Sequence, residues 1–305
     1  MIERPALWLQ IIRADRFEVA VGALDEYEMC VPNRAHRDAL VSRITDYGQR
    51  WAQFHDLPDP PRCRITVESV PPQHVGLGVG TQLGLAVAAG LNAHRGLGQP
   101  TAVELATSVG RGLRSAVGTY GFVQGGLIVE RGKLPGEAIA PLDCRLALPV
   151  DWHVVLIQPY EAMGLSGTAE QDAFDGLPPV PKAVTTRLIE EIRLRMLPAA
   201  VRGDFDTFSE SVYRYGRLAG MCFAAVQGGP YNGPRLEQLV ERIRSMGIRG
   251  VGQSSWGPTL FAMLPDRATA ETFRSRLAGE LSSTEAQLVV TALNHGGARV
   301  LVEAV

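Results

Sequence analysis

Apolar positions along the chain predict an α+β protein in which strands and helices do not simply alternate. Between Asn33, an expected helix cap, and Phe54, apolar residues recur at steps of three and four, which places them on one helical face. Between Arg62 and Val70, apolar and polar residues alternate as in a strand with one buried face. The apolar helix positions are Leu40, Ile44, Tyr47, Trp51 and Phe54, and the buried strand positions are Cys63, Ile65 and Val67.

Two domains are expected, because 305 residues exceed the size at which one core comfortably grows. We place them at residues 1–150 and 151–305. Besides the helix and strand above, the first domain is expected to contain strands within 8–21, a helix ending near His94, a short helix opened by a Thr101–Glu104 capping box, and a strand at 127–130. The second is expected to contain a strand at 152–158, a long loop at 164–181, helices near 183–197, 204–225 and 234–246, strands at 248–253 and 259–264, a helix at 267–281, and strands at 286–292 and 298–304.

Composition narrows the class of protein. Apolar residues make up 46% of the chain, and the net charge is −2, so no general affinity for nucleic acid or anionic membranes is implied. The longest nearly uncharged stretch, Val75–Ala93, is interrupted by glycines and is a poor membrane span, and no export signal is visible, so we expect a cytoplasmic protein. Scattered cysteines and histidines give little support for a protein-built metal site. Lys133 and Lys182 are the only lysines, and neither belongs to a P-loop.

The densest feature is a glycine-rich stretch between a predicted strand and a predicted helix. Glycine lets the backbone approach a ligand closely, and free N–H groups at a helix start favour an anion. A tight strand–helix connection would also explain glycines here, although three alternating ones less well. The stretch comprises Gly76, Gly78, Gly80, Thr81 and Gln82.

Two later stretches carry further candidates. Arg111 and Arg114 follow a predicted helix end, where a guanidinium can fork onto phosphate oxygens, although both could equally be solvated surface residues. Neutral hydrogen-bonding side chains and a tryptophan lie in the turn between two apolar strands near the C-terminus. They suit an anionic or planar ligand, and the tryptophan could instead pack between domains. These turn residues are Gln253, Ser254, Ser255 and Trp256.

Together the three stretches resemble one enzyme family. A strand, then G-L-G-V-G-T-Q, then an Ala-rich helix is similar to the phosphate-binding motif of GHMP kinases, with Thr-Gln in place of their Ser-Ser. The passage G-R-G-L-R-S-A-V-G-T-Y-G-F-V-Q-G-G-L-I-V at 110–129 and the passage G-V-G-Q-S-S-W-G-P-T at 250–259 resemble those of β-ribofuranosylaminobenzene 5′-phosphate synthases. The resemblance runs from about Glu18 to the C-terminus.

The resemblance implies a GHMP-kinase-like fold with a ribosomal-protein-S5-like N-terminal domain and a ferredoxin-like C-terminal domain. It implies condensation of 5-phosphoribosyl 1-pyrophosphate with 4-aminobenzoate, or a related benzoate, with loss of pyrophosphate and carbon dioxide, for methanopterin-type cofactor biosynthesis. Mg²⁺ and a homodimer are expected. The implied catalytic residues are Arg111, Arg114 and Gln124, and the implied binding residues are those of the glycine stretch, Ser115, and Gln253 to Trp256.

The chain also departs from this pattern. The family's opening hairpin is not visible, so the first domain is expected to lack it, and Gln124 and Lys133 stand where an acidic residue and a histidine are expected. Two alternatives therefore remain open. One is an ATP-dependent GHMP-type kinase, which the Thr81–Gln82 pair disfavours, and the other is a non-catalytic ligand-binding homologue.

Overall fold

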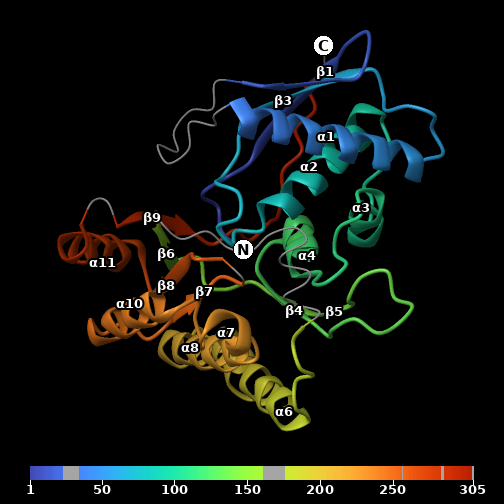
Figure 1. The fold of residues 1–305 in the computed structure, drawn as a ribbon. Coiled ribbons are helices and arrows are strands. Elements are labelled where there is room, and N and C mark those ends of the chain that lie inside the picture. The colour runs from blue at the N-terminus through green and yellow to red at the C-terminus, as the bar shows by residue number, and fades with distance from the viewer. Residues whose placement is uncertain (23–33, 161–175, 256, 283–284, 304–305) are drawn as a thin grey trace.

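The computed structural model describes residues 1–22, 34–160, 176–255, 257–282 and 285–303. Figure 1 shows two groups of elements, one built from the first half of the sequence and one from the second, which meet near the N-terminus. The sheets of the two groups are separated in sequence between Leu146 and His153. A domain boundary near residue 150 remains a prediction that this arrangement supports.

The first half centres on a three-stranded sheet in the order β1-β3-β2. β1 (Trp8–Arg13) runs antiparallel to β3 (Cys63–Ser69), and β2 (Glu18–Val21) runs parallel to β3 because α1 (Arg34–Phe54) crosses over between them. The predicted β3 positions, Cys63, Ile65 and Val67, are fully buried against α1 and α2 (Val79–His94). The Asn33 cap lies outside the described residues.

The remaining elements of the first half lie beside α2. α3 (Ala102–Ser108) begins at Thr101, and the predicted capping box with Glu104 is confirmed. α4 (Val117–Gln124) and β5 (Leu142–Leu146), which pairs with β4 (Leu127–Glu130), were not predicted. The glycines of 110–126 concealed α4, because glycine in a helix interior is unfavourable unless tertiary packing compensates. Here Tyr120 and Phe122 supply that packing.

The second half forms a four-stranded antiparallel sheet in the order β7-β8-β6-β9, which is the ferredoxin-like arrangement. β6 is His153–Pro159, β7 Val251–Gln253, β8 Leu260–Leu264 and β9 Ala286–Ala292. One face, with Val155 and Ile157, packs on α10 (Pro234–Ser245) and α11 (Arg267–Glu280). The other face carries Val154 and Leu156 and packs on α7 (Leu197–Arg202), on α8 (Phe205–Met221) and on the first half. The expected α+β fold class and the ferredoxin-like second half are confirmed.

Some predicted boundaries were wrong. The helix near 183–197 extends to Arg202 through α6 (Lys182–Glu191) and a π-helical turn, Ile192–Met196. The helix of 204–225 ends at Met221, before the short α9 (Ala224–Gln227). Residues 298–303 form no strand, and Leu301 is 79% exposed. Apolar residues favour a strand only where they pack on neighbouring strands, and this segment pairs with none of the described ones. Residues 176–181 are a loop, as predicted, and the rest of that predicted loop lies outside the described residues.

The two halves share a core. Leu77 and Leu127 from the first half and Ile2 near the N-terminus pack against the face of Val154 and Leu156. Ile2 also bridges to Leu293, just beyond β9. Burial of this apolar surface holds the halves together at the base of the glycine-rich stretch.

Two glycines of α8 give opposite predictions for the same substitution. A Cβ at Gly216 would meet nothing within 4 Å, whereas a Cβ at Gly220 would lie 2.0 Å from the carbonyl oxygen of Pro230. We expect Gly216→Ala to raise the free energy of unfolding by about 0.5–1 kcal/mol through helix propensity. Gly220→Ala should lower it by about 1–3 kcal/mol through overpacking. Urea unfolding of both variants tests this, and equal effects would contradict the packing described.

Candidate active site at the glycine loop

The glycine loop, residues 75–82, ends the connection from β3 to α2 and includes the first turn of that helix, in agreement with the predicted strand–loop–helix order. Gly76 has φ +90° and Gly78 has φ +68°, conformations that glycine adopts without strain. Gly78 is the N-cap of α2 and offers no side chain to the first-turn N–H groups. The N–H groups of Thr81 and Gln82 donate to the carbonyl of Gly78, whereas those of Val79 and Gly80 have no intrahelical acceptor. They lie at the positive end of the helix dipole, so an anion placed here is stabilised.

The loop between β7 and β8 closes directly onto the glycine loop. The Ser254 hydroxyl donates to the carbonyl of Gly76, and Thr259 Oγ1 donates to the carbonyl of Val75 at 2.6 Å. A Cβ on Gly257 would lie 2.2 Å from the Cα of Gly76, so the two backbones touch. Two motifs that are far apart in the sequence therefore meet at one place.

The other predicted residues of this loop lie differently. The side-chain oxygen of Gln253 accepts a hydrogen bond from the backbone N–H of Asn232 at 2.7 Å, so Gln253 fixes the start of α10 against β7. Ser255 is exposed. Trp256 lies outside the described residues, and its stacking on an aromatic substrate stays a prediction.

Arg111 reaches the glycine loop from the segment after α3. Its Nη2 donates to Thr81 Oγ1 at 3.1 Å, and its Nε is buried with no hydrogen-bond partner in the described part of the chain. The stem of Arg111 passes against Gly84, where an added Cβ would lie 3.3 Å from Arg111 Cγ. The guanidinium thus lies at the first turn of α2. Arg114 and Ser115, by contrast, are exposed, and Ser115 Oγ accepts from the N–H of Val117 at 3.3 Å.

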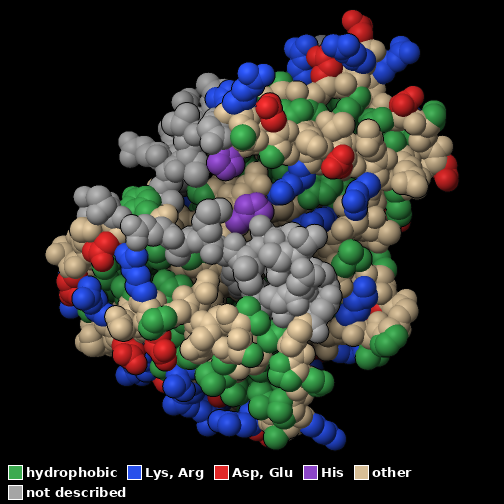
Figure 2. Space-filling model, viewed as in Figure 1, with side chains coloured by type: hydrophobic (Ala, Val, Ile, Leu, Met, Phe, Trp, Pro, Cys, Tyr) green, Lys and Arg blue, Asp and Glu red, His purple; other side chains and the backbone are tan. Residues whose placement is uncertain are grey.

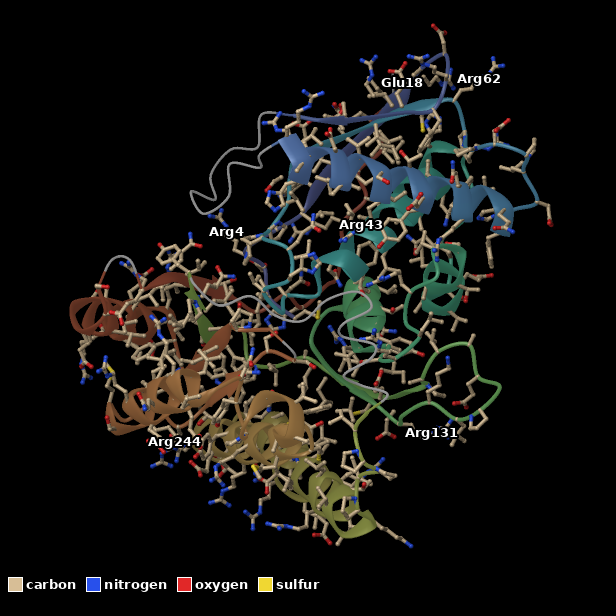
Figure 3. All side chains as sticks on the ribbon, in the orientation of Figure 1. Arg4, Glu18, Arg43, Arg62, Arg131 and Arg244 are labelled. Atoms are coloured by element: carbon tan, nitrogen blue, oxygen red, sulfur yellow. The ribbon has the colours of Figure 1, made fainter. Side chains whose placement is uncertain are left out.

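Two site residues on α1 were missed from the sequence. The Tyr47 hydroxyl donates to the carbonyl of Gly80 at 3.0 Å, and Arg43, one turn earlier, donates to Gln73 Oε1 at 2.8 Å. A Cβ on Gly80 would lie 3.4 Å from Arg111 Nη2 and 3.8 Å from Arg43 Nη1, so two guanidinium groups flank this glycine. Figure 3 shows Arg43 on the side of α1 that faces α2, and Figure 2 shows basic side chains gathered below α1.

The sequence did contain a signal for this pair. Arg43 and Tyr47 are spaced i, i+4 on the helix and therefore share one side of it. The apolar pattern accounted for Tyr47 as a core residue. A tyrosine can pack its ring in the core and still use its hydroxyl as a hydrogen-bond donor at a site. Among the residues that the structure describes, neither Arg43 nor Arg111 has a carboxylate partner. Their charges therefore remain to act on an anion.

α4 closes the other side of the loop. Gln82 Nε2 donates to the carbonyl of Gly118 at 3.0 Å, and the carboxylate of Glu130 accepts from the N–H of Ala116 at 2.5 Å. Gln124 lies at the far end of α4, where its carbonyl accepts from Arg145 at 3.0 Å. The described contacts thus connect Gln82 and Gly118 to the loop, and they do not connect Gln124 to it.

The described residues offer little to a protein-built metal centre or to a thiol nucleophile. They contain no group of three His, Cys, Asp or Glu side chains that could hold a metal ion. Burial raises the pKa of the Cys63 thiol to about 11, and the pKa values of Cys144 and Cys222 are also raised, mainly by burial. Because the thiolate is the nucleophilic form, these cysteines are unsuited to covalent catalysis.

A hollow of about 580 Å³ lies at the other end of α2 and is lined by residues that include Arg13, Arg62, His94 and Arg95. None of the glycine-loop residues borders it. A helix of this length spans about 24 Å, so the hollow is remote from the site. Across the described part of the chain, no helix has the length and apolarity that crossing a bilayer requires.

Comparison with known proteins identifies the family. The chain is 30% identical over 267 residues to the beta-ribofuranosylphenol 5′-phosphate synthase of Methanothermobacter thermautotrophicus, covering 82% of this chain and 79% of that protein. The chain belongs to the β-ribofuranosylphenol 5′-phosphate synthase family. A second synthase of that name, from Archaeoglobus fulgidus, is 30% identical over 271 residues, covering 84% of this chain and 72% of the relative. The expected family is thereby confirmed, with relatives named for a phenol rather than for an aminobenzene.

The wider relationship is also confirmed. Residues 196–282 match the model described as GHMP kinases C terminal. The fold is similar to homoserine kinase from Cytophaga hutchinsonii, with TM-score 0.62 and 14% identity, covering 97% of this chain and 89% of that one. It is similar as well to phosphomevalonate kinase from Streptococcus pneumoniae, with TM-score 0.60 and 12% identity, covering 93% and 88% of the two chains. At such identities the likeness shows the fold alone.

The backbone contact between the two loops predicts that Gly257 tolerates no side chain. In Gly257→Ala the new Cβ would meet backbone atoms of Val75 and Gly76, which cannot rotate away as a side chain can. We expect a loss of about 1–3 kcal/mol in unfolding free energy, together with weakened phosphate binding. Thermal unfolding and titration with inorganic pyrophosphate measure the two effects. Gly279→Ala in α11, where a Cβ meets nothing within 4 Å, is the control. Unchanged stability in Gly257→Ala would contradict the contact.

Proposed function

We propose that this protein condenses 5-phosphoribosyl 1-pyrophosphate with a 4-substituted benzoate, 4-hydroxybenzoate by the relatives' name, as a step in methanopterin-type cofactor biosynthesis. The bond from ribose C1 to pyrophosphate breaks, a carbon–carbon bond forms from C1 to the ring carbon that carries the carboxylate, and that carboxylate leaves as carbon dioxide. The observation that carries the proposal is the convergence of Arg43 and Arg111 on the first turn of α2.

The site suits departure of a polyanion. Pyrophosphate gains negative charge as the bond from C1 breaks, and the α2 N-terminus and two guanidinium groups are positioned to stabilise that charge. Tyr47 and Thr81 fix Gly80 and Arg111, so little reorganisation is needed during the reaction. No nucleophilic side chain is required, because the aromatic ring attacks C1 directly.

A divalent cation would fit this chemistry, because the leaving pyrophosphate is a polyanion. Mg²⁺ is usually held by one or two carboxylates together with substrate phosphates. Glu130, whose carboxylate lies at the start of α4, is the side chain that we assign to it. When bound, the ion would neutralise charge on the leaving group, while Arg43 and Arg111 orient the phosphates.

The alternative is an ATP-dependent kinase, because proteins named as kinases share this fold. The Q-S-S-W turn, through which the chain resembles the synthases, speaks against it, and Ser254 of that turn contacts the glycine loop. Incubation with 5-phosphoribosyl 1-pyrophosphate and carboxyl-labelled 4-hydroxybenzoate or 4-aminobenzoate, with and without ATP, separates the readings. Release of labelled carbon dioxide and pyrophosphate without ATP is expected. Retained label, or phosphorylation of an alcohol by ATP, would refute the proposal, and binding without turnover would indicate a non-catalytic homologue.

Substitution of Arg111 should lower catalytic activity without lowering the stability of the protein. A charge-assisted hydrogen bond contributes roughly 1.5–3 kcal/mol, which corresponds to about 10- to 150-fold in kcat/KM. We therefore expect Arg111→Ala to lower kcat/KM for 5-phosphoribosyl 1-pyrophosphate at least about tenfold, with the melting temperature little changed. Arg111→Lys should restore only part of the loss, since lysine lacks the planar fork.

The matched control is Arg114→Ala, since Arg114 is exposed three residues along the same segment. Steady-state kinetics should show a much smaller loss for it. Equal losses in both variants would return Arg114 to the site, and wild-type efficiency in Arg111→Ala would remove Arg111 from it.

A further inference from the structure

A polar row crosses the sheet face on which the glycine loop rests. On β6, Val154 and Leu156 face the first half, whereas Val155 and Ile157 face α10 and α11. Because side chains alternate along a strand, Gln158 lies on the face of Val154 and Leu156. The same alternation places Thr259 on this face, since Phe261 and Met263 belong to it.

The register brings these side chains together. Ile157 pairs with Leu260 on β8, so one further step places Gln158 opposite Thr259. On its other side Gln158 pairs with Gln287 of β9. Neighbouring strands lie about 4.8 Å apart, so Thr259, Gln158 and Gln287 form a continuous row. Its first member holds the glycine loop, because the Thr259 hydroxyl donates to the carbonyl of Val75.

The two glutamines in this row have unused hydrogen-bonding groups. Gln158 is only 1% exposed, yet neither its side-chain nitrogen nor its side-chain oxygen has a partner among the described residues, and the side-chain oxygen of Gln287 is also buried without one there. Buried amides are almost always paired, because an unmade hydrogen bond costs the full desolvation of the group. Two such side chains, adjacent to each other and beside the glycine loop, point to a ligand.

We infer that Gln158 and Gln287 bind a neutral hydroxyl group of the substrate, an inference that rests on the proposed function for the substrate's identity. A carboxamide both donates and accepts, which matches a hydroxyl, whereas anionic groups are matched by the arginines at the other side of the glycine loop. Two parts of the reactants carry such a group, namely the 4-hydroxyl of the benzoate and the hydroxyls of the ribose. The glutamines are therefore specificity-determining residues.

The test uses a substitution that should weaken ligand binding without lowering the stability of the protein. Gln158→Met keeps the length of the side chain and removes an unpaired buried amide, so the melting temperature should stay the same or rise. Binding of the hydroxyl-bearing substrate should weaken about tenfold or more, because the site then lacks its partner. Gln287→Met should act in the same direction, and Gln10→Met on the exposed position of β1 is the matched control.

Isothermal titration of the full chain, with pyrophosphate and Mg²⁺ present, measures binding of 4-hydroxybenzoate in one arm and of ribose 5-phosphate in the other. Weakening in either arm supports the inference and names the reactant. Unchanged binding in both arms, or wild-type protein that binds neither probe, overturns it. A fall in melting temperature with unchanged binding would show that the amides contribute only to the stability of the fold. The titration measures binding and needs no turnover. It can therefore support or overturn the role of the glutamines even if the condensation assay shows no product.

Discussion

The touching backbones of Gly76 and Gly257 are the constraint on which the site depends. Two loops from different halves can approach to this distance only where both residues lack a side chain, and hydrogen bonds from Ser254 and Thr259 then hold them in place. The contact fixes the glycine loop against the second sheet, which positions the first turn of α2 relative to everything that the second half supplies. A loop held only by its own helix would not fix the position of the first turn of α2 relative to the second half.

The two halves contribute side chains of different charge around the contact between Gly76 and Gly257. The cationic groups come from the first half, on α1 and on the segment after α3, whereas the second half contributes neutral hydroxyl and amide groups. Such a division suits a substrate that is anionic at one end and only polar at the other. It also separates two tasks, because charge governs capture of the phosphates and shape with hydrogen bonding governs choice among neutral partners.

Much of this could be predicted from the sequence, for physical reasons that differ by residue. The α1 stripe, the alternation of β3 and the capping box of α3 are local patterns, and local patterns determine element type. The glycine loop and the Ser254 turn were identified as candidates through motif resemblance. Arg43, Gln158 and Gln287 were not predicted, because each becomes a site residue only when strand register and helix packing bring distant segments together. α4 was missed because its glycines have low helix propensity, which the tertiary packing of Tyr120 and Phe122 offsets.

The site is also a late product of folding. Ser254 and Gly76 are 178 residues apart in the sequence, so their contact closes a loop of most of the chain. Contacts of such separation form after the local ones that build each half. During synthesis the first half emerges with Leu77 and Leu127 still uncovered, since the sheet face that buries them is made later. Until the second half is complete, the newly made first half therefore presents an apolar surface next to its phosphate loop, and this intermediate is the form of the protein most open to aggregation or chaperone capture.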